Sequence, residues 1–580
     1  MRKLVCACAL LVACASHDSN VRPPTPTATA TASAAEPPAA SAPLVVALVV
    51  DQLAAWEIAE RAPELPKGGG FARLLREGAY ARDMRYAHAV TETSPGHSSL
   101  FTGAAPYRSG IFANELVDPA TRKRVSSLRD PSTRVVTAAG VQNAPSVSLA
   151  SLEVDTVADV LRARAPHATI ISVSLKDRGA AFAGGRHPDA TIWYSASRDA
   201  FVTSTAFTST FPDWARFVDR DLLEHMRSEP WNLLDPVFVA SHAKQPDAQP
   251  GESEVFGFGS TFPHSFARAR FPAVAFRASP RADEAELALA AAALDRRNPK
   301  EPMLLAVSLS AFDYVNHYWG PDSWESWDEL LRIDRALAGF FALLDRKAGP
   351  DGWAAVLSGD HGGPPLPEAP DAARPWCAHG DSSDPWQRPC RRVGRIFPDA
   401  LRDTLEKAAD KALGKPKDWI LGVASPYVFY THFAAELPRD RRAKLDAAVT
   451  TALLANPEID RIFPPRAPGS TCPPEQTDES IDALVCRSMS PKNRDALFVL
   501  EKRGSFVDTD YDLGKGMSHG GPYLFDRSVP LFVRARGRVR GGTVITEPIG
   551  FGAYVRSVAA LLGVPPPKDA SEAREIVPPK

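Results

Sequence analysis

The sequence predicts an α/β fold in which a mostly parallel central sheet has helices on both faces. Three features support this class: continuous apolar runs rich in Val, Ile and Leu, amphipathic helical stretches between them, and polar residues where several runs end. Runs of this kind are typical of strands buried on both faces of a parallel sheet. The five clearest are LVVALVV (44–50), ATIISVSL (168–175), MLLAVSLS (303–310), WAAVLSG (353–359) and SVPLFVRA (528–535).

The spacing of apolar residues between these runs predicts helices that cover the sheet. In ELLRIDRALAGFFALLD (329–345), apolar side chains recur at helical spacing. The rhythm of strand and helix changes at about 364–515, and we expect this segment to be an inserted α+β lobe within one domain over residues 44–570. Within the segment, helical patterns cover 399–413 and 441–454, and strand patterns cover 427–433 and 496–502.

The first residues have the pattern of an export signal. Arg2 and Lys3 precede an apolar run that is too short to span a bilayer. Leu11-Val12-Ala13-Cys14 resembles a bacterial lipobox, so we predict a lipoprotein-type signal peptide over residues 1–14 and a lipid anchor at Cys14, with simple secretion as the alternative. Residues 15–43 are mostly Pro, Thr, Ala and Ser with almost no large apolar residues, a composition that predicts a disordered linker. We therefore expect an exported protein, either periplasmic or anchored to the outer membrane.

The overall charge of the chain limits the kinds of binding partner that we expect. Lys plus Arg (67) nearly balance Asp plus Glu (69), so no global field favours nucleic acid, and we expect membrane contact only through Cys14.

Beyond the signal region the cysteines are Cys377, Cys390, Cys472 and Cys486. In an exported protein this even number favours two disulfides. The spacing favours Cys377 with Cys390 and Cys472 with Cys486, and the other two connectivities stay open.

Acidic residues and histidines follow three of the predicted strands. Asp51 ends the first run, Asp313 lies beyond the third, and Asp360-His361 follows the fourth. A single Asp in such a place is more often a turn former than a ligand, but the carboxyl ends of parallel strands meet at one edge of the sheet. His317 would share a helix face with Asp313, and His519 precedes the last strand. Carboxylate oxygen combined with imidazole nitrogen suits zinc better than magnesium or calcium.

Together with the turn TSPGH (93–97), this ordered set resembles the two-zinc branch of the alkaline phosphatase superfamily. The branch contains the nucleotide pyrophosphatase/phosphodiesterases and the PafA-type threonine-nucleophile alkaline phosphatases. The resemblance implies an alkaline phosphatase-like fold, Thr93 as the nucleophile and two Zn²⁺ ions. A hydroxyl at a helix N-terminus is usually only a cap, but zinc and the helix N-terminus would together stabilise a Thr93 alkoxide. The implied ligands are Asp313, His317 and His519 for one ion, and Asp51, Asp360 and His361 for the other, with the Thr93 oxygen beside it.

Two further segments bear on whether the substrate is a phosphate monoester or a diester. Lys176 and Arg178, in SLKDRGA, are two residues apart, so on an extended segment both would face the site. Composition alone would make them a charged loop paired with Asp177. The resemblance instead assigns both, and Asn114 in GIFANELVD, to phosphate oxygens. Because a monoester dianion calls for added cations, we expect a phosphomonoesterase that acts on small phosphate esters, with a phosphodiesterase as the alternative.

Two other classes are disfavoured by the same residues. A sulfatase would need Cys or Ser at the start of a CxPxR-type turn, and TSPGH has neither that residue nor the Arg. A surface binding protein that had lost its chemistry would be expected to have a broken ligand set. All six implied ligands and Thr93 are present in this chain.

Overall fold

The computed structural model describes residues 43–578, with gaps at 244, 370–375, 378–383, 391–392, 468, 491–495 and 509–511. The predicted signal peptide, the predicted anchor at Cys14 and residues 15–42 of the predicted linker lie outside the described residues. Within the described part of the chain, no helix is both long enough and apolar enough to cross a membrane.

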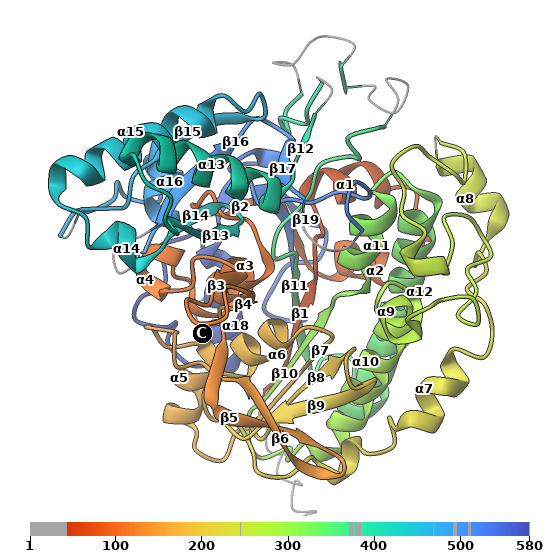
Figure 1. Ribbon diagram of the computed structural model, residues 1–580. Coiled ribbons are helices and arrows are strands. Elements are labelled where there is room, and N and C mark those ends of the chain that lie inside the picture. The colour runs from red at the N-terminus through yellow and green to blue at the C-terminus, as the bar shows by residue number, and fades with distance from the viewer. Residues whose placement is uncertain are drawn as a thin grey trace, which may run out of the picture. The chain divides into compact units, whose positions relative to one another are not determined.

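The centre of the main sheet is parallel, as the sequence predicts (Figure 1). The strand β1 (Leu44–Val50) lies between β10 (Met303–Leu309) and β11 (Ala354–Ser358), and all three run in the same direction. Beyond β10 the parallel order continues through β7 (Thr169–Ser174) and β8 (Ala190–Ser195). Each of these strands is almost completely buried, which accounts for the unbroken apolar runs.

Towards both edges the sheet is mixed, with antiparallel pairs next to the parallel centre. The last predicted strand, β18 (Ser528–Ala535), forms at the expected residues but pairs antiparallel with β11. On the other side, β9 (Ala200–Ser204) is antiparallel to β8. The remaining strands of this sheet are β2 (Ala79–Arg85), β5 (Arg129–Thr137), β6 (Gly140–Val147), β19 (Thr543–Ile545) and β20 (Ile549–Gly550).

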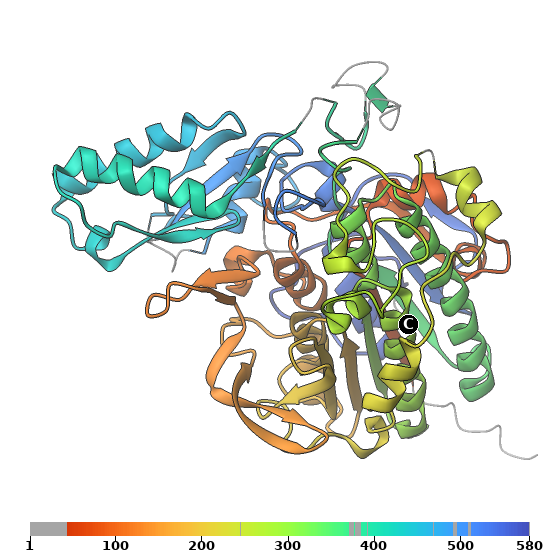
Figure 2. The same ribbon diagram turned by 45° about the vertical axis from the view of Figure 1, so that its right-hand side comes forward.

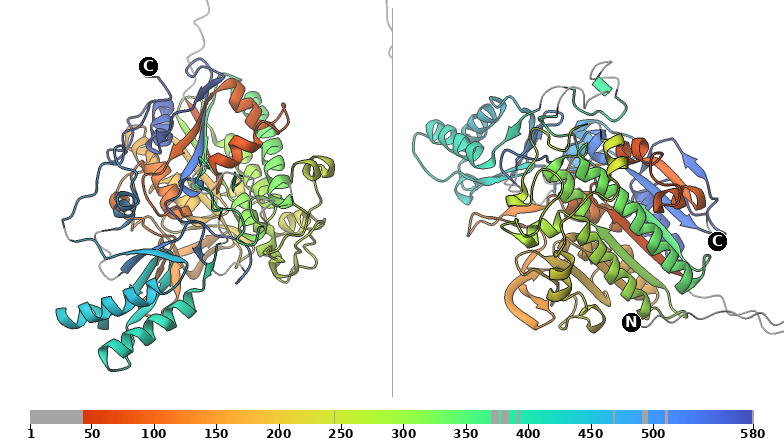
Figure 3. Two further views of the ribbon diagram at one scale, coloured as in Figure 1. Left: turned by 90° about the horizontal axis from the view of Figure 1, so that it is seen from above. Right: turned by 90° about the vertical axis from the view of Figure 1, so that its right-hand side faces the viewer.

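Helices cover both faces of the main sheet (Figures 1 and 3). Side chains of β1 point alternately to the two faces: Leu48 packs in one hydrophobic core, and its neighbour Val49 packs in the other. The first core contains α10 (Pro280–Ala293) and α12 (Trp324–Ala348), and α12 includes the helix predicted at 329–345. The second core contains α3 (Thr93–Thr102), α6 (Asp177–Gly184) and α18 (Gly552–Leu562).

A second, antiparallel sheet lies in the segment predicted to be a lobe. Its order is β13 (Ile420–Ala424), β14 (Tyr427–Tyr430), β16 (Ala496–Glu501) and β15 (Ile459–Phe463). The helices α13 (Pro398–Leu413) and α15 (Arg439–Leu454) pack on one face of it (Figure 2). The strand predicted over 427–433 is shorter than expected, because α14 (His432–Ala435) begins after Thr431.

Both predicted disulfides are confirmed. Cys377 pairs with Cys390 and Cys472 pairs with Cys486. The second disulfide joins the coil before α16 (Ile481–Ser488) to that helix. The other elements are α1 (Ala55–Arg61), α2 (Gly70–Glu77), α4 (Pro106–Ser109), α5 (Val157–Arg164), α7 (Arg220–Met226), α8 (Pro236–His242), α9 (Pro272–Arg277), α11 (Ala311–Trp319), α17 (Leu524–Arg527), β3 (Glu115–Val117), β4 (Arg124–Ser126), β12 (Arg395–Ile396) and β17 (Phe506–Val507).

Candidate two-metal active site

Asp51, Asp360 and His361 form a buried group at the carboxyl ends of β1 and β11. Their ligand atoms lie within 4.8 Å of one another. His361 Nε2 is 3.5 Å from Asp51 Oδ1 and 3.5 Å from Asp360 Oδ2. Because β1 and β11 are adjacent and parallel, residues far apart in the sequence meet at this edge.

Asp313, His317 and His519 form a second group of the same kind. Asp313 and His317 lie one turn apart on α11, so both side chains are on one face of that helix. His317 Nε2 is 3.3 Å from Asp313 Oδ1, and His519 Nε2 is 3.6 Å from the same oxygen. All three residues are buried, and their ligand atoms also lie within 4.8 Å of one another.

The tautomers of the three histidines suit metal binding. The Nδ1 atoms lie against backbone carbonyl oxygens: His317 at 2.7 Å from Met517 O, His519 at 2.8 Å from Thr91 O, and His361 at 3.0 Å from Gly362 O. A carbonyl only accepts, so each Nδ1 carries the hydrogen and each Nε2 presents a lone pair to the carboxylates. Two lone-pair atoms facing each other need a cation between them. The donor set therefore fits a metal ion at each group.

The unpartnered ligand atoms and the pKa shifts of these residues also fit a metal ion at each group. Asp51 Oδ1, Asp313 Oδ1 and His361 Nε2 are buried and have no hydrogen-bond partner among the described residues. Burial lowers the pKa of His361 to about 3, so its ring is neutral at pH 7, as a metal ligand must be. Burial alone would raise the pKa of Asp313, but the ammonium of Lys176 is the main influence that holds it well below its usual value.

Thr93 is the first residue of α3, and the start of this helix lies against Asp360. A Cβ atom added to Gly96 would come within 2.3 Å of the Asp360 carbonyl oxygen, so only glycine permits this approach. His97 Nδ1 is 3.0 Å from Asp360 Oδ2. The ring of His97 therefore orients a predicted ligand.

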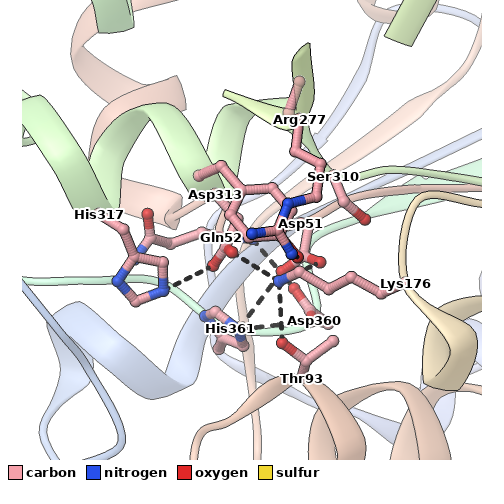
Figure 4. Close-up of polar contacts among 12 residues, drawn as sticks. Asp51, Gln52, Thr93, Lys176, Arg277, Ser310, Asp313, His317, Asp360 and His361 are labelled. Carbon is pink, nitrogen blue, oxygen red and sulfur yellow. Dashed lines mark hydrogen bonds and ion pairs between the residues drawn. The ribbon is translucent and has the colours of Figure 1, made fainter. Parts of the chain in front are cut away.

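Lys176 links the two groups (Figure 4). Its Nζ is 2.5 Å from Asp313 Oδ2, 2.8 Å from Asp51 Oδ2 and 3.1 Å from Thr93 Oγ1. Burial would lower the pKa of Lys176, but the carboxylates of Asp313 and Asp51 raise it above its usual value, so the ammonium is charged. The side chain is 1% exposed, so Lys176 is not part of a solvated charged loop.

Arg178 and Asn114 line the same cavity as Thr93. The cavity has a volume of about 580 Å³. The sequence suggested that Lys176 and Arg178 lie on one extended segment, and this expectation is wrong. The strand β7 ends at Ser174 and the helix α6 begins at Asp177, so Arg178 is in the helix and Lys176 precedes it. Asn114 Oδ1 accepts a hydrogen bond from Ser94 N at 2.7 Å, so Nδ2 is the donor that this side chain retains.

Sequence reasoning missed several residues of the cavity wall. Arg277 Nη1 donates a hydrogen bond to the Tyr314 hydroxyl at 3.3 Å, and its guanidinium lies 4.6 Å from the centre of the Tyr314 ring. Phe256 and Phe271 also line the cavity. Tyr314 follows Asp313 in the sequence, so its place in the cavity wall could have been predicted. Arg277, Phe256 and Phe271 lie in a segment that contains no buried strand from which to predict their positions.

Glu92, next to Thr93, was also missed. Burial raises its pKa to about 8, although the backbone N–H of Asn114 donates to its Oε2 at 2.7 Å and opposes the shift. Glu92 therefore carries a proton over much of the neutral range. This limits the negative charge beside the site.

Comparison with known proteins identifies the family. The profile of the type I phosphodiesterase / nucleotide pyrophosphatase family matches residues 45–406. The chain belongs to this family. The matched range contains Asp51, Thr93, Lys176, Asp313 and the Asp360-His361 pair, and ends before His519.

Within the family, the chain is similar to alkaline phosphatases of the PafA type, as the ligand order predicts. It is 35% identical over 335 residues to alkaline phosphatase PhoV of Synechococcus elongatus, a match that covers 56% of this chain and 60% of PhoV. It is 29% identical to alkaline phosphatase PhoK of a Sphingomonas species, covering 92% of this chain and 90% of PhoK. The crystal structure of wild-type alkaline phosphatase PafA superposes with a TM-score of 0.77 at 24% identity, covering 92% of this chain and 98% of that one, which confirms the alkaline phosphatase-like fold.

Proposed function

We propose that this protein is an exported, zinc-dependent phosphatase that hydrolyses small phosphate monoesters through a covalent phosphothreonine at Thr93. The observation that carries the proposal is the position of Lys176, a buried ammonium 3.1 Å from the Thr93 hydroxyl and in contact with one carboxylate of each ligand group. The names of PhoV and PhoK as alkaline phosphatases support the same activity.

Each ligand group would hold one zinc ion: Asp313, His317 and His519 the first, and Asp51, Asp360 and His361 the second, with the Thr93 oxygen next to it. When bound, a pair of zinc ions neutralises charge on a phosphoryl group and favours an ionised oxygen nucleophile. Zinc is favoured over magnesium because each group contains imidazole nitrogen.

The residues of the chain would then act on the phosphoryl group in two displacements. The Thr93 oxygen forms a bond to phosphorus while the bond from phosphorus to the leaving oxygen breaks, which releases the alcohol. Water then displaces the Thr93 oxygen, releases phosphate and restores the hydroxyl. The N-terminus of α3 stabilises negative charge on the Thr93 oxygen in both steps.

Three side chains would hold the non-bridging oxygens of the substrate. Lys176 and Arg178 supply positive charge, and Asn114 supplies the Nδ2 donor that its contact with Ser94 leaves available. A monoester dianion has one more charged oxygen than a diester and so gains more from two cations. This difference favours a phosphomonoesterase over the alternative, a phosphodiesterase that uses the same two ligand groups.

The test compares p-nitrophenyl phosphate with bis-p-nitrophenyl phosphate, using zinc-loaded wild-type protein and Lys176→Ala. We expect the wild type to prefer the monoester, and the variant to lose kcat/KM for the monoester more than for the diester. A wild type that prefers the diester, with a ratio that Lys176→Ala does not change, would assign the protein to the phosphodiesterases.

Export is part of the proposal. The two disulfides favour an oxidising compartment, in agreement with the signal pattern at residues 1–14. We propose a periplasmic protein or a lipoprotein anchored to the outer membrane through Cys14, which mass spectrometry of the mature N-terminus would test by detecting lipid on that cysteine.

A further inference from the structure

One wall of the catalytic cavity is aromatic and partly exposed. Phe256 and Phe271 are 40% and 45% exposed, although large apolar side chains are usually buried. Their ring centres are 5.3 Å apart, with an angle of 83° between the ring planes. Both rings line the cavity that contains Thr93. An exposed aromatic pair inside a catalytic cavity indicates contact with a ligand.

The backbone that carries Phe256 is strained. Val255 has φ 44° and Phe256 has φ 55°, a region that residues with a side chain rarely adopt, and least of all a β-branched valine. Such strain persists only where surrounding contacts impose it, and it occurs most often at functional sites.

Hydrogen bonds fix this segment to the helix that carries two predicted ligands. Ser253 N donates to Tyr318 O on α11 at 2.9 Å, and Ser253 Oγ accepts from Val255 N at 2.9 Å. On the other side, Arg270 N donates to Phe256 O at 2.9 Å, which links the segments of the two phenylalanines. The aromatic pair therefore has a fixed position relative to Asp313 and His317.

Arg277 adds a cation to the same wall. It ends α9, the helix that follows Phe271, and its guanidinium is held over the ring of Tyr314. Figure 4 shows this guanidinium turned towards Lys176 and Asp313. Lys176 Nζ lies 5.1 Å from the centre of the same ring, so Tyr314 supports two cations.

The in-line geometry of the proposed reaction places the leaving group next to the aromatic wall of the cavity. In a phosphoryl transfer the attacking and leaving oxygens are roughly in line. Thr93 lies beside the group that contains Asp360, so the leaving oxygen would lie towards the group on α11. Tyr314 and Tyr318, which are on α11 with Asp313 and His317, line the same cavity as Phe256 and Phe271.

We propose that Phe256, Phe271 and Arg277 form a leaving-group subsite that favours phosphate monoesters of aromatic alcohols carrying an anionic substituent. This inference rests on the proposed function. The two rings would contact the aromatic ring of the leaving group, and Arg277 would bind its anion. The subsite uses other residues than Lys176, Arg178 and Asn114, which would hold the transferred phosphoryl group, and it adjoins that group because Arg277 and Lys176 contact the same ring of Tyr314.

The test measures kcat/KM of the zinc-loaded protein for glycerol phosphate, phenyl phosphate and p-carboxyphenyl phosphate. Intrinsic reactivity cancels when each variant is compared with wild type on the same substrate. Phe256→Ala and Phe271→Ala should each lower kcat/KM roughly three- to tenfold for both aryl esters and much less for glycerol phosphate. Arg277→Gln should lower it roughly tenfold for the carboxylated ester and much less for phenyl phosphate.

Matched controls are Phe397→Ala, which removes a phenylalanine that is 41% exposed but does not line the cavity, and Arg220→Gln on the surface of α7. Calorimetry with phenylphosphonate and methylphosphonate gives a second readout, and the preference for the phenyl compound should fall in Phe256→Ala. Equal losses on all three substrates would overturn the inference, because they would assign these residues to the phosphoryl group or to folding. A wild type that hydrolyses none of the monoesters would instead refute the proposed function.

Discussion

Replacing Lys176 by methionine should destabilise the chelated protein much more than the zinc-loaded protein. The ammonium is buried and lies 2.5 Å from Asp313 Oδ2 and 2.8 Å from Asp51 Oδ2. Methionine keeps most of the side-chain volume but removes the charge. Under chelation, two buried carboxylates then lose the cation that they share.

The contact distances set the size of the effect. At an effective dielectric constant of about 20, each pair gains on the order of 6 kcal/mol of Coulomb energy, most of which offsets the cost of desolvating the charges. Breaking a buried pair by removing one partner costs about 3–5 kcal/mol. We expect a loss of that size in chelator. With zinc we expect a loss of about 1 kcal/mol or less, because the ions would compensate the same carboxylates.

The assay is denaturant unfolding of wild type and Lys176→Met, each with chelator and with excess zinc. Lys347→Met is the matched control, since it removes an exposed lysine that pairs with Asp295 and should have little effect in either condition. Equal losses with and without zinc would refute the reasoning, because the contribution of Lys176 would then be independent of the ligand groups.

Four further predictions follow from the site and the fold. Thr93→Ala should lower kcat by roughly a thousandfold or more with little change in unfolding free energy, since its hydroxyl is the proposed nucleophile. Asp360→Asn should lower the zinc content measured by elemental analysis from two ions per chain to one, whereas an unchanged content would contradict the assignment. Burial raises the pKa of Glu92 from 4.5 to about 8, so the contribution of Glu92 to stability falls as the pH rises between those two values. Glu92→Gln should therefore unfold at a higher denaturant concentration than the wild type at pH 9, but not at pH 4. Replacing Cys472 and Cys486 by serine should lower the unfolding free energy by about 3 kcal/mol relative to the oxidised wild type, and this difference should nearly vanish when both proteins are reduced.

Much of the fold and of the candidate site could be predicted, because apolar runs and residue spacings within short stretches of the sequence indicate them. LVVALVV and WAAVLSG are continuous apolar runs, so the ends of two buried strands, and with them Asp51 and Asp360-His361, could be located. The four-residue spacing of Asp313 and His317 matches one turn of α11. The direction of β18 could not be predicted, because a buried antiparallel strand has the same apolar pattern as a parallel one.

The cavity wall could not be predicted for a different reason. Phe256, Phe271 and Arg277 lie in short elements between β9 and β10 that have no strong periodicity, and tertiary hydrogen bonds and ring contacts fix their positions. The raised pKa of Glu92 likewise depends on burial by segments distant in the sequence. Sequence reasoning therefore located the predicted ligands and the proposed nucleophile but not the residues that would select the leaving group.

The most direct test of the account is to trap the phosphorylated enzyme. Zinc-loaded protein that is turning over p-nitrophenyl phosphate is quenched in acid, digested and analysed by mass spectrometry. The proposed mechanism predicts a phosphoryl group on the peptide that contains Thr93, localised to that residue and missing from Thr93→Ala. Steady turnover with no phosphorylated peptide, or a phosphoryl group on another residue, would contradict it.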